Sequence, residues 1–182
     1  MKNLYAIAIW VLATGLLIGC GTLNRQVEMV SFPSPKGWPK GDKHAKYVQS
    51  FTVTPREAYL TRFVYEGESI DNWTESLEIY NTWKKNFPPT PEKAYNMLIE
   101  KRNKMCPEAK ASVISQDNNS ILYEIITIDC PPHPDENSLN RILYGNSDVF
   151  NLIYTNKVRT LAGETRDDWI RVLSEAHIET IK

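Results

Sequence analysis

The sequence predicts an α+β domain: a single twisted antiparallel sheet of about six to seven strands with two main helices packed on it, preceded by a signal helix and a Pro/Gly-rich tether. The periodicity gives the order strand, strand, strand, helix, four strands, helix. Its connections are too short for the crossovers that parallel strands need. Apolar residues make up 42% of the 182 residues and aromatic residues 10%, which is enough for a hydrophobic core.

The first twenty residues have the pattern of a secretory signal. A single cation, Lys2, is followed by an apolar run over residues 4–17, and the small Gly19 precedes Cys20. A bilayer span needs about 20 consecutive apolar residues, so this run is too short to be one. We therefore assign residues 1–19 to a signal peptide, with the alternative of a start helix that happens to contain a cysteine.

The tetrapeptide Leu17-Ile18-Gly19-Cys20 resembles the bacterial lipobox. This resemblance implies a diacylglycerol on the Cys20 sulfur, cleavage between Gly19 and Cys20, and acylation of the new amine, including palmitate-type chains. In the enterobacterial type of sorting, an Asp after the cysteine retains a lipoprotein in the inner membrane. Gly21 stands there instead, so the resemblance implies the outer membrane, on the side that faces the periplasm.

Residues 20–45 are predicted to be the lipidated cysteine and a flexible tether. Three prolines and two glycines between residues 33 and 41 disfavour both helix and strand. A flexible chain of this length would reach about 25 to 30 Å. Trp38 is expected to dock onto the folded domain, because an aromatic ring buries a large area, with a loose aromatic at the membrane interface as the alternative. The globular α+β domain is then residues 46–182.

Three strands are predicted before the first helix. One begins near Lys46, the second covers residues 58–65, and the third places Trp73, Leu77 and Ile79 on one face. Thr90 and Pro91 have the residue types of an N-cap and a first helical position, and Pro107 ends the helix. The last helix is expected to begin at Thr165 as N-cap and to bury the following residues: Trp169, Val172, Leu173 and Ala176.

Two hairpins separate these helices. Their strands are predicted at residues 111–115, 121–129, 139–144 and 149–154, with Asn and Gly residues in the turns. The order of elements over residues 90–154 is similar to that of the PsbP-like fold. This resemblance implies the fold only, because a fold does not determine a function.

Cys106 and Cys130 remain as an even pair once Cys20 is assigned to lipid. Cys106 ends the first helix, and the chain then runs out along one strand and back along the next, so Cys130 returns to the same end of the sheet. An oxidising compartment favours a disulfide between them. The alternatives are a redox pair or, with His133, a metal site, but there is no Cys-x-x-Cys and no set of four zinc ligands.

No motif in the sequence predicts catalysis or a cofactor. The three histidines, His44, His133 and His177, are far apart, and a triad could be assembled only by the fold. The acidic residues around the turn at 66–75 are expected to be solvated, with a paired-carboxylate site as the alternative. The net charge of −1 offers no field that would attract nucleic acid, and we expect no nucleic-acid partner.

Two groups of residues are candidate interfaces. Tyr80 and Trp83 are aromatic residues that the strand pattern leaves off the core face, although they could belong to a second core. Lys101, Arg102 and Lys104 could form a basic patch, although a solvated helix face is the simpler interpretation.

Three functions are compatible with the sequence. The preferred one is a membrane-anchored periplasmic lipoprotein, a non-enzymatic binding or envelope-assembly module for an envelope protein partner. The others are an immunity or exclusion lipoprotein that neutralises a toxin or competitor, and a small periplasmic enzyme, which would show a deep pocket with perturbed titratable groups.

Overall fold

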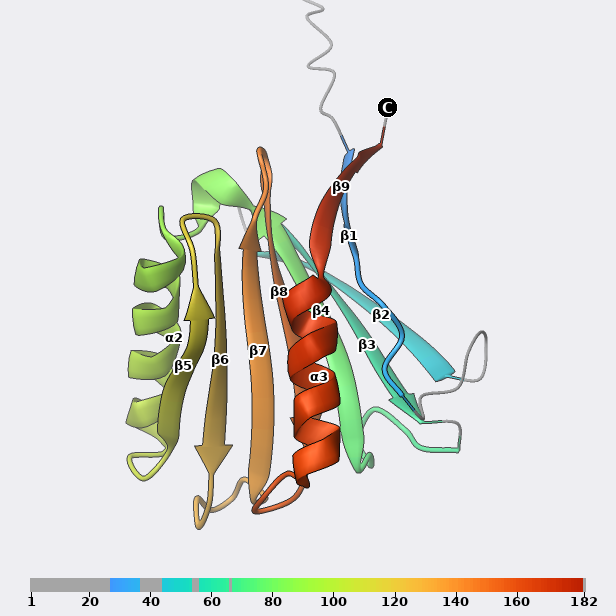
Figure 1. Ribbon diagram of the computed structural model, residues 1–182, viewed down its shortest axis with the longest axis vertical. Helices are drawn as coiled ribbons and strands as arrows, with labels where there is room; N and C mark the ends of the chain where they lie inside the picture. Colours follow the sequence, from blue (N-terminus) through green and yellow to red (C-terminus); the bar gives the residue numbers. More distant parts are fainter. Residues whose placement is uncertain (1–26, 37–43, 54–55, 66, 182) are drawn as a thin grey trace, which may run out of the picture.

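The computed structural model describes residues 27–36, 44–53, 56–65 and 67–181 (Figure 1). The predicted signal peptide, the cleavage site between Gly19 and Cys20, and Trp38 lie outside these residues. The lipid anchor, its cleavage site and the docking of Trp38 therefore stay predictions.

The body of the protein is a seven-stranded sheet in which every neighbouring pair is antiparallel. The strand order across the sheet is β2-β3-β4-β8-β7-β6-β5. The predicted antiparallel sheet and its two hairpins are confirmed. The strands are β2 (His44–Val53), β3 (Arg56–Tyr65), β4 (Glu75–Trp83), β5 (Lys110–Gln116), β6 (Ser120–Thr127), β7 (Glu136–Tyr144) and β8 (Asp148–Asn156).

A separate two-stranded ribbon joins the two ends of the described chain. β1 (Val27–Ser31) pairs antiparallel with β9 (His177–Ile181), so that Val27 lies opposite Ile181 and Ser31 opposite His177. Neither strand was predicted. For residues 27–36 the prediction of an unstructured tether is wrong, because this segment pairs with β9 and then runs along the last helix (Figure 1).

The two helices differ in how they begin, because α2 has a side-chain N-cap and α3 has none. α2 (Pro91–Met105) has Thr90 as its N-cap, whose hydroxyl accepts the Lys93 N–H at 3.3 Å, as predicted. α3 (Gly163–Glu175) begins after Ala162, which has no side-chain cap, so the prediction of Thr165 as N-cap is wrong. A short 3-10 turn, η1 (Lys84–Asn86), connects β4 to the segment before α2.

The helices cover opposite faces of the sheet, which therefore forms the middle of three layers. α3 buries Trp169, Val172 and Leu173 against one face, where the Trp169 ring stacks on Tyr154 with centroids 4.0 Å apart. α2 covers the other face, where Tyr95 meets Tyr123 edge-on. The strands under both helices are buried on both sides, since β6 alternates Ile121, Tyr123 and Ile125 toward α2 with Leu122 and Glu124 toward α3.

A buried carboxylate fastens α3 to the sheet. Glu124 on β6 accepts three hydrogen bonds from the Arg166 guanidinium, the shortest at 2.8 Å, and a fourth from the Asn137 amide. Burial alone would raise the pKa of Glu124, but these donors outweigh it and hold the pKa below its usual value. The pair gives α3 a fixed position on the sheet.

The two ends of the sheet carry different connections. The upper end in Figure 1 carries the β7–β8 turn (residues 145–147), and the lower end carries the start of β7 at Glu136. At about 3.4 Å per residue, β7 separates the two ends by about 27 Å.

Candidate functional site

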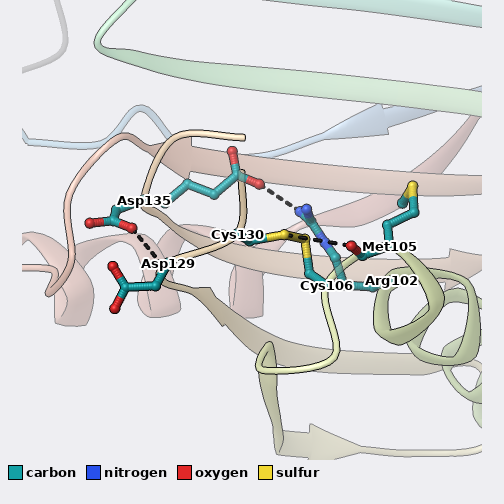
Figure 2. Close-up of a disulfide and its surroundings, with 7 residues drawn as sticks. Arg102, Met105, Cys106, Asp129, Cys130 and Asp135 are labelled. Atoms are coloured by element: carbon teal, nitrogen blue, oxygen red, sulfur yellow. Dashed lines mark hydrogen bonds and ion pairs between the residues drawn. A yellow bond between two sulfur atoms is a disulfide. The ribbon is translucent and has the colours of Figure 1, made fainter. Parts of the chain in front are cut away.

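The predicted disulfide is confirmed. Cys106, at the end of α2, is bonded to Cys130 in the loop after β6, with Cα atoms 5.6 Å apart and both residues buried (Figure 2). The bond ties α2 to the lower end of the sheet. Arg102 lies one helical turn earlier and pairs with Glu136 at 2.6 Å, so an ion pair reinforces the same junction (Figure 2).

The candidate basic patch lies at this lower end, and most of its charge is already paired. Arg102 is bound to Glu136, and Lys104 contacts Glu100 one turn earlier on the same helix at 2.7 Å. Lys101 is exposed to solvent. Arg102 therefore has a structural partner on the sheet, and the exposed Lys104–Glu100 pair is of a kind that contributes little to stability.

The candidate aromatic residues lie on β4, away from the basic patch. Tyr80 and Trp83 fall on opposite faces of the strand, since side chains alternate. Trp83 is the last residue of β4, opposite Asp148 at the upper end, and the Lys85 amine lies 4.2 Å above its ring. The structure thus places Trp83 at the upper end of the sheet, Tyr80 in the middle of β4 on the other face, and the three basic residues at the lower end. Whether any of them binds a partner stays a prediction.

A carboxylate latch at the upper end holds β1 on the body. Glu28 is only 5% exposed and inserts into the β7–β8 turn. Its Oε1 accepts the Asn146 N–H at 2.7 Å, and its Oε2 accepts the N–H groups of Ser147 at 3.0 Å and Asp148 at 2.9 Å. A Cβ at Gly145 would lie 2.4 Å from Glu28 Oε2, so the glycine makes room for the carboxylate. We call these five residues the Glu28 latch.

The latch stabilises the ionised form of Glu28. Burial alone would raise the pKa of this carboxyl, but three backbone N–H groups and the Ser147 hydroxyl donate to it and hold the pKa below its usual value of 4.5. A group with a depressed folded pKa stabilises the fold fully above the unfolded value. The contribution of the latch is lost as the pH falls through the lower, folded pKa.

Glu28→Gln is expected to lower the free energy of opening the β1–β9 ribbon by about 1–3 kcal/mol. The neutral amide loses the charge-assisted hydrogen bonds and turns an N–H₂ group toward N–H donors. Hydrogen exchange of residues 27–31 and 177–181 measures this opening. Exchange in the wild type should accelerate below pH 4.5, while the variant should lack this acid-dependent increase. Glu179→Gln, which removes only the exposed contact with His177 on the same ribbon, is the matched control and should keep the acid-dependent increase.

Gly145→Ala tests the same latch from the other side. The added methyl group should displace the Glu28 carboxylate and lower the free energy of unfolding of the wild type. The same substitution should lower it much less in a Glu28→Ala background, because the clash is then absent. Equal losses of unfolding free energy in the two backgrounds would show that Gly145 is needed for another reason than making room for Glu28.

A cleft of about 510 Å³ opens at the upper end between the β5–β6 turn and the start of β9. Ser120 Oγ donates to Asp117 at 2.8 Å, and Arg141 donates to Ser120 at 3.4 Å and to the Leu173 carbonyl at 2.5 Å. Burial lowers the pKa of Arg141. His177 lines the cleft, but its ring nitrogens contact the Glu175 carbonyl and the Glu179 carboxylate. These polar groups form hydrogen bonds with one another and with the backbone, so their contacts connect the elements around the cleft to one another.

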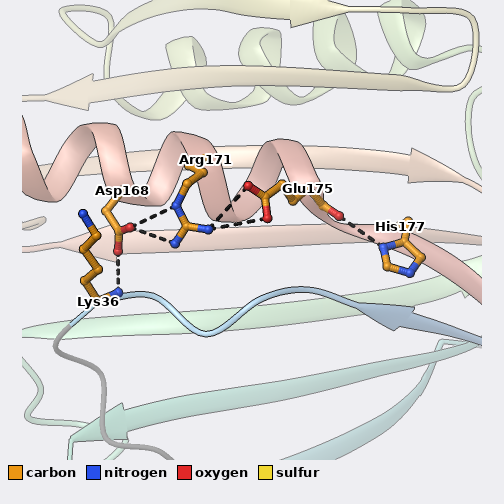
Figure 3. Close-up of polar contacts among 5 residues, drawn as sticks. All are labelled: Lys36, Asp168, Arg171, Glu175 and His177. Carbon is orange, nitrogen blue, oxygen red and sulfur yellow. Dashed lines mark hydrogen bonds and ion pairs between the residues drawn. The ribbon is translucent and has the colours of Figure 1, made fainter.

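A second cleft, of about 630 Å³, lies between residue 36 and the first turns of α3. The Lys36 N–H donates to Asp168 at 2.5 Å, and Arg171 pairs with the same carboxylate at 2.9 Å and with Glu175 at 3.5 Å (Figure 3). Asp168 therefore holds the segment after β1 against α3. Among the described residues, no group of three or more His, Cys, Asp or Glu side chains is placed to hold a metal ion.

Comparison with known proteins gives no further assignment. The chain matches no protein-family model, no curated protein and no solved structure. The likeness to the PsbP-like fold and to the lipobox therefore rests on the residues quoted above.

The latch is the feature that sequence reasoning missed. Glu28 falls within the predicted tether, and the local strand signal is weak, because the apolar residues of the segment 27–32 do not alternate regularly. The partner turn was recognised as a turn, but nothing near it in the sequence identifies a carboxylate more than a hundred residues away as its ligand.

Proposed function

We propose that this protein is a lipid-anchored envelope protein, held on the periplasmic side of the outer membrane by acyl chains on Cys20, whose folded domain binds an envelope protein. A single acyl chain of myristoyl length gives only marginal membrane binding, whereas a fully processed lipobox cysteine carries up to three chains. The same proposal includes a signal helix and a lipidated tether before the domain. The tether runs from Cys20 to the residue before β1, which begins at Val27.

The observation that supports this proposal most is the Cys106–Cys130 disulfide. Structural disulfides persist in oxidising compartments and are rare where glutathione and thioredoxin keep thiols reduced. A buried disulfide that ties a helix to its sheet suits a domain that works outside the cytoplasm. It agrees with a signal of the lipobox type at the start of the same chain.

Protease treatment of cells tests the location. The proposal predicts that the domain resists protease in intact cells and is digested once the outer membrane is permeabilised with the inner membrane intact. It also predicts that the protein sediments with outer-membrane markers in a density gradient. Digestion that requires opening of the inner membrane as well would place the domain in the cytoplasm and contradict the proposal.

Crosslinking in the intact envelope tests the binding role. A photoreactive residue at position 101 probes the lower surface, and one at position 85 probes the upper surface. A specific, stoichiometric adduct with one envelope protein from either position supports the binding role. Adducts with no protein from either position would contradict binding through these surfaces.

A further inference from the structure

The ribbon of β1 and β9 has two chemically different faces. The inner face carries Glu28 in its latch, together with Val30 and Ile178, which pack on the core beneath α3. The outer face carries Val27 and Met29, with Ile181 directly opposite Val27. These three aliphatic side chains are 56%, 50% and 48% exposed. We call them the ribbon tip.

The outer face becomes polar with distance from this tip. Met29 lies opposite Glu179, and Ser31 lies opposite His177, whose ring contacts the Glu179 carboxylate. The apolar side chains thus lie in the half of the ribbon where β1 begins and β9 ends. In Figure 1 this is the top of the ribbon. Exposed apolar side chains grouped beside a polar surface are typical of a contact surface.

The length of chain before the ribbon limits where the lipid can be. Seven residue steps separate Cys20 from Val27, and a fully extended chain spans at most about 3.6 Å per residue. The ribbon tip therefore lies within about 25 Å of a lipid bound at Cys20, and a flexible chain of this length has a mean span of about 15 Å. This is much closer than a tether ending at residue 45 would allow.

A cationic and aromatic group lies at the same end of the molecule. The β7–β8 turn receives Glu28 from the ribbon on one side, and on the other it contacts η1, since the Lys84 amine donates to the Gly145 carbonyl at 2.8 Å. Lys85 follows, exposed, with its amine over the Trp83 ring. Trp and Lys side chains are enriched where proteins meet lipid headgroups.

We propose that the ribbon tip is a membrane-contact surface, which rests on the lipid bilayer that holds Cys20 and orients the domain with its upper end toward that bilayer. This inference depends on the proposed lipid anchor. The acyl chains supply the attachment, and the three aliphatic side chains of the tip fix the orientation. The lower end, with the disulfide and Lys101, then points away from the membrane and is presented to a partner.

A fluorescence-quenching experiment tests this inference. Cys20 is lipidated in the proposal and Cys106 is bonded to Cys130, so an added cysteine is the one free thiol. Full-length lipidated Ile181→Cys, labelled with an environment-sensitive dye, is reconstituted into vesicles of phosphatidylethanolamine and phosphatidylglycerol that contain a headgroup-proximal nitroxide lipid. Met29→Cys is the second tip position, and Asn103→Cys, exposed at the lower end, is the control.

Dyes at positions 181 and 29 should be quenched several-fold more strongly than a dye at position 103. Equal quenching at the two ends in vesicles that carry the protein overturns the orientation and leaves the anchor intact. Failure of the protein to float with the vesicles overturns the anchor and this inference together. If the tip dyes are protected from solvent in native envelope membranes but not in vesicles without other proteins, the tip contacts a protein and not lipid, and the inference is overturned.

Discussion

Replacing Cys106 or Cys130 with alanine is expected to lower the free energy of unfolding by about 3.5 kcal/mol, because the bond closes a loop with a sequence separation of 24 residues in the unfolded chain. This is a large fraction of the 5 to 15 kcal/mol typical of a folded domain. In thermal unfolding it corresponds to a fall in Tm on the order of 10 °C. The loss should be similar for either cysteine.

Matched variants separate the bond from the packing around it. The double variant should be no less stable than either single variant, since each change removes the same bond. Reduction of the wild type should reproduce the loss, and reduction of the double variant should change nothing. A wild-type Tm that does not respond to reductant would contradict a stabilising role for the disulfide.

Cys20→Ala, combined with an ordinary Ala-x-Ala secretory signal in place of residues 1–19, is expected to move the protein entirely from the membrane fraction to the soluble fraction. The acyl chains are the anchor in our proposal, and the ribbon tip alone exposes only three aliphatic side chains. Among the described residues, no helix has both the length and the hydropathy needed to cross a bilayer. Cell fractionation measures the result.

Stability and location should respond independently. The Tm of the Cys20→Ala domain should equal that of the wild type, because the substitution leaves the β1–β9 pairing and the latch unchanged. Cys106→Ala should show the reverse pattern, with a lower Tm and unchanged membrane attachment. A soluble-signal variant that stays with the membrane after its signal has been removed would reveal another anchor.

Local sequence signals were sufficient for most of the sheet. The hairpin at residues 110–127 and the one at 136–156 were predicted because turn residues interrupt runs of β-branched and aromatic residues. The N-cap of α2 was predicted because Thr90-Pro91 combines two local preferences. At α3 the start is formed by Ala162 and Gly163, which carry no capping side chain, so a prediction based on capping residues falls on Thr165 instead.

Features that depend on distant pairing were not predicted. β1 is a strand because β9, at the other end of the chain, pairs with it and because the β7–β8 turn binds Glu28. The assignment of the two helices to opposite faces also has no local signature, because β6 carries apolar residues on both sides, with Glu124 among those on the α3 side, and its pattern fits a continuous buried run. Trp83 and the basic candidates are close in sequence but lie at opposite ends of the sheet, because α2 runs between them along the sheet.

Mass spectrometry of the N-terminal tryptic peptide, from protein extracted with detergent from its native membrane, tests the central claim most directly. Our account predicts a peptide of residues 20–25 that begins at Cys20 and carries a diacylglycerol on sulfur and an acyl chain on the amine. A chain that still begins with unmodified Met1, or a peptide starting at Cys20 without fatty acid, would contradict it.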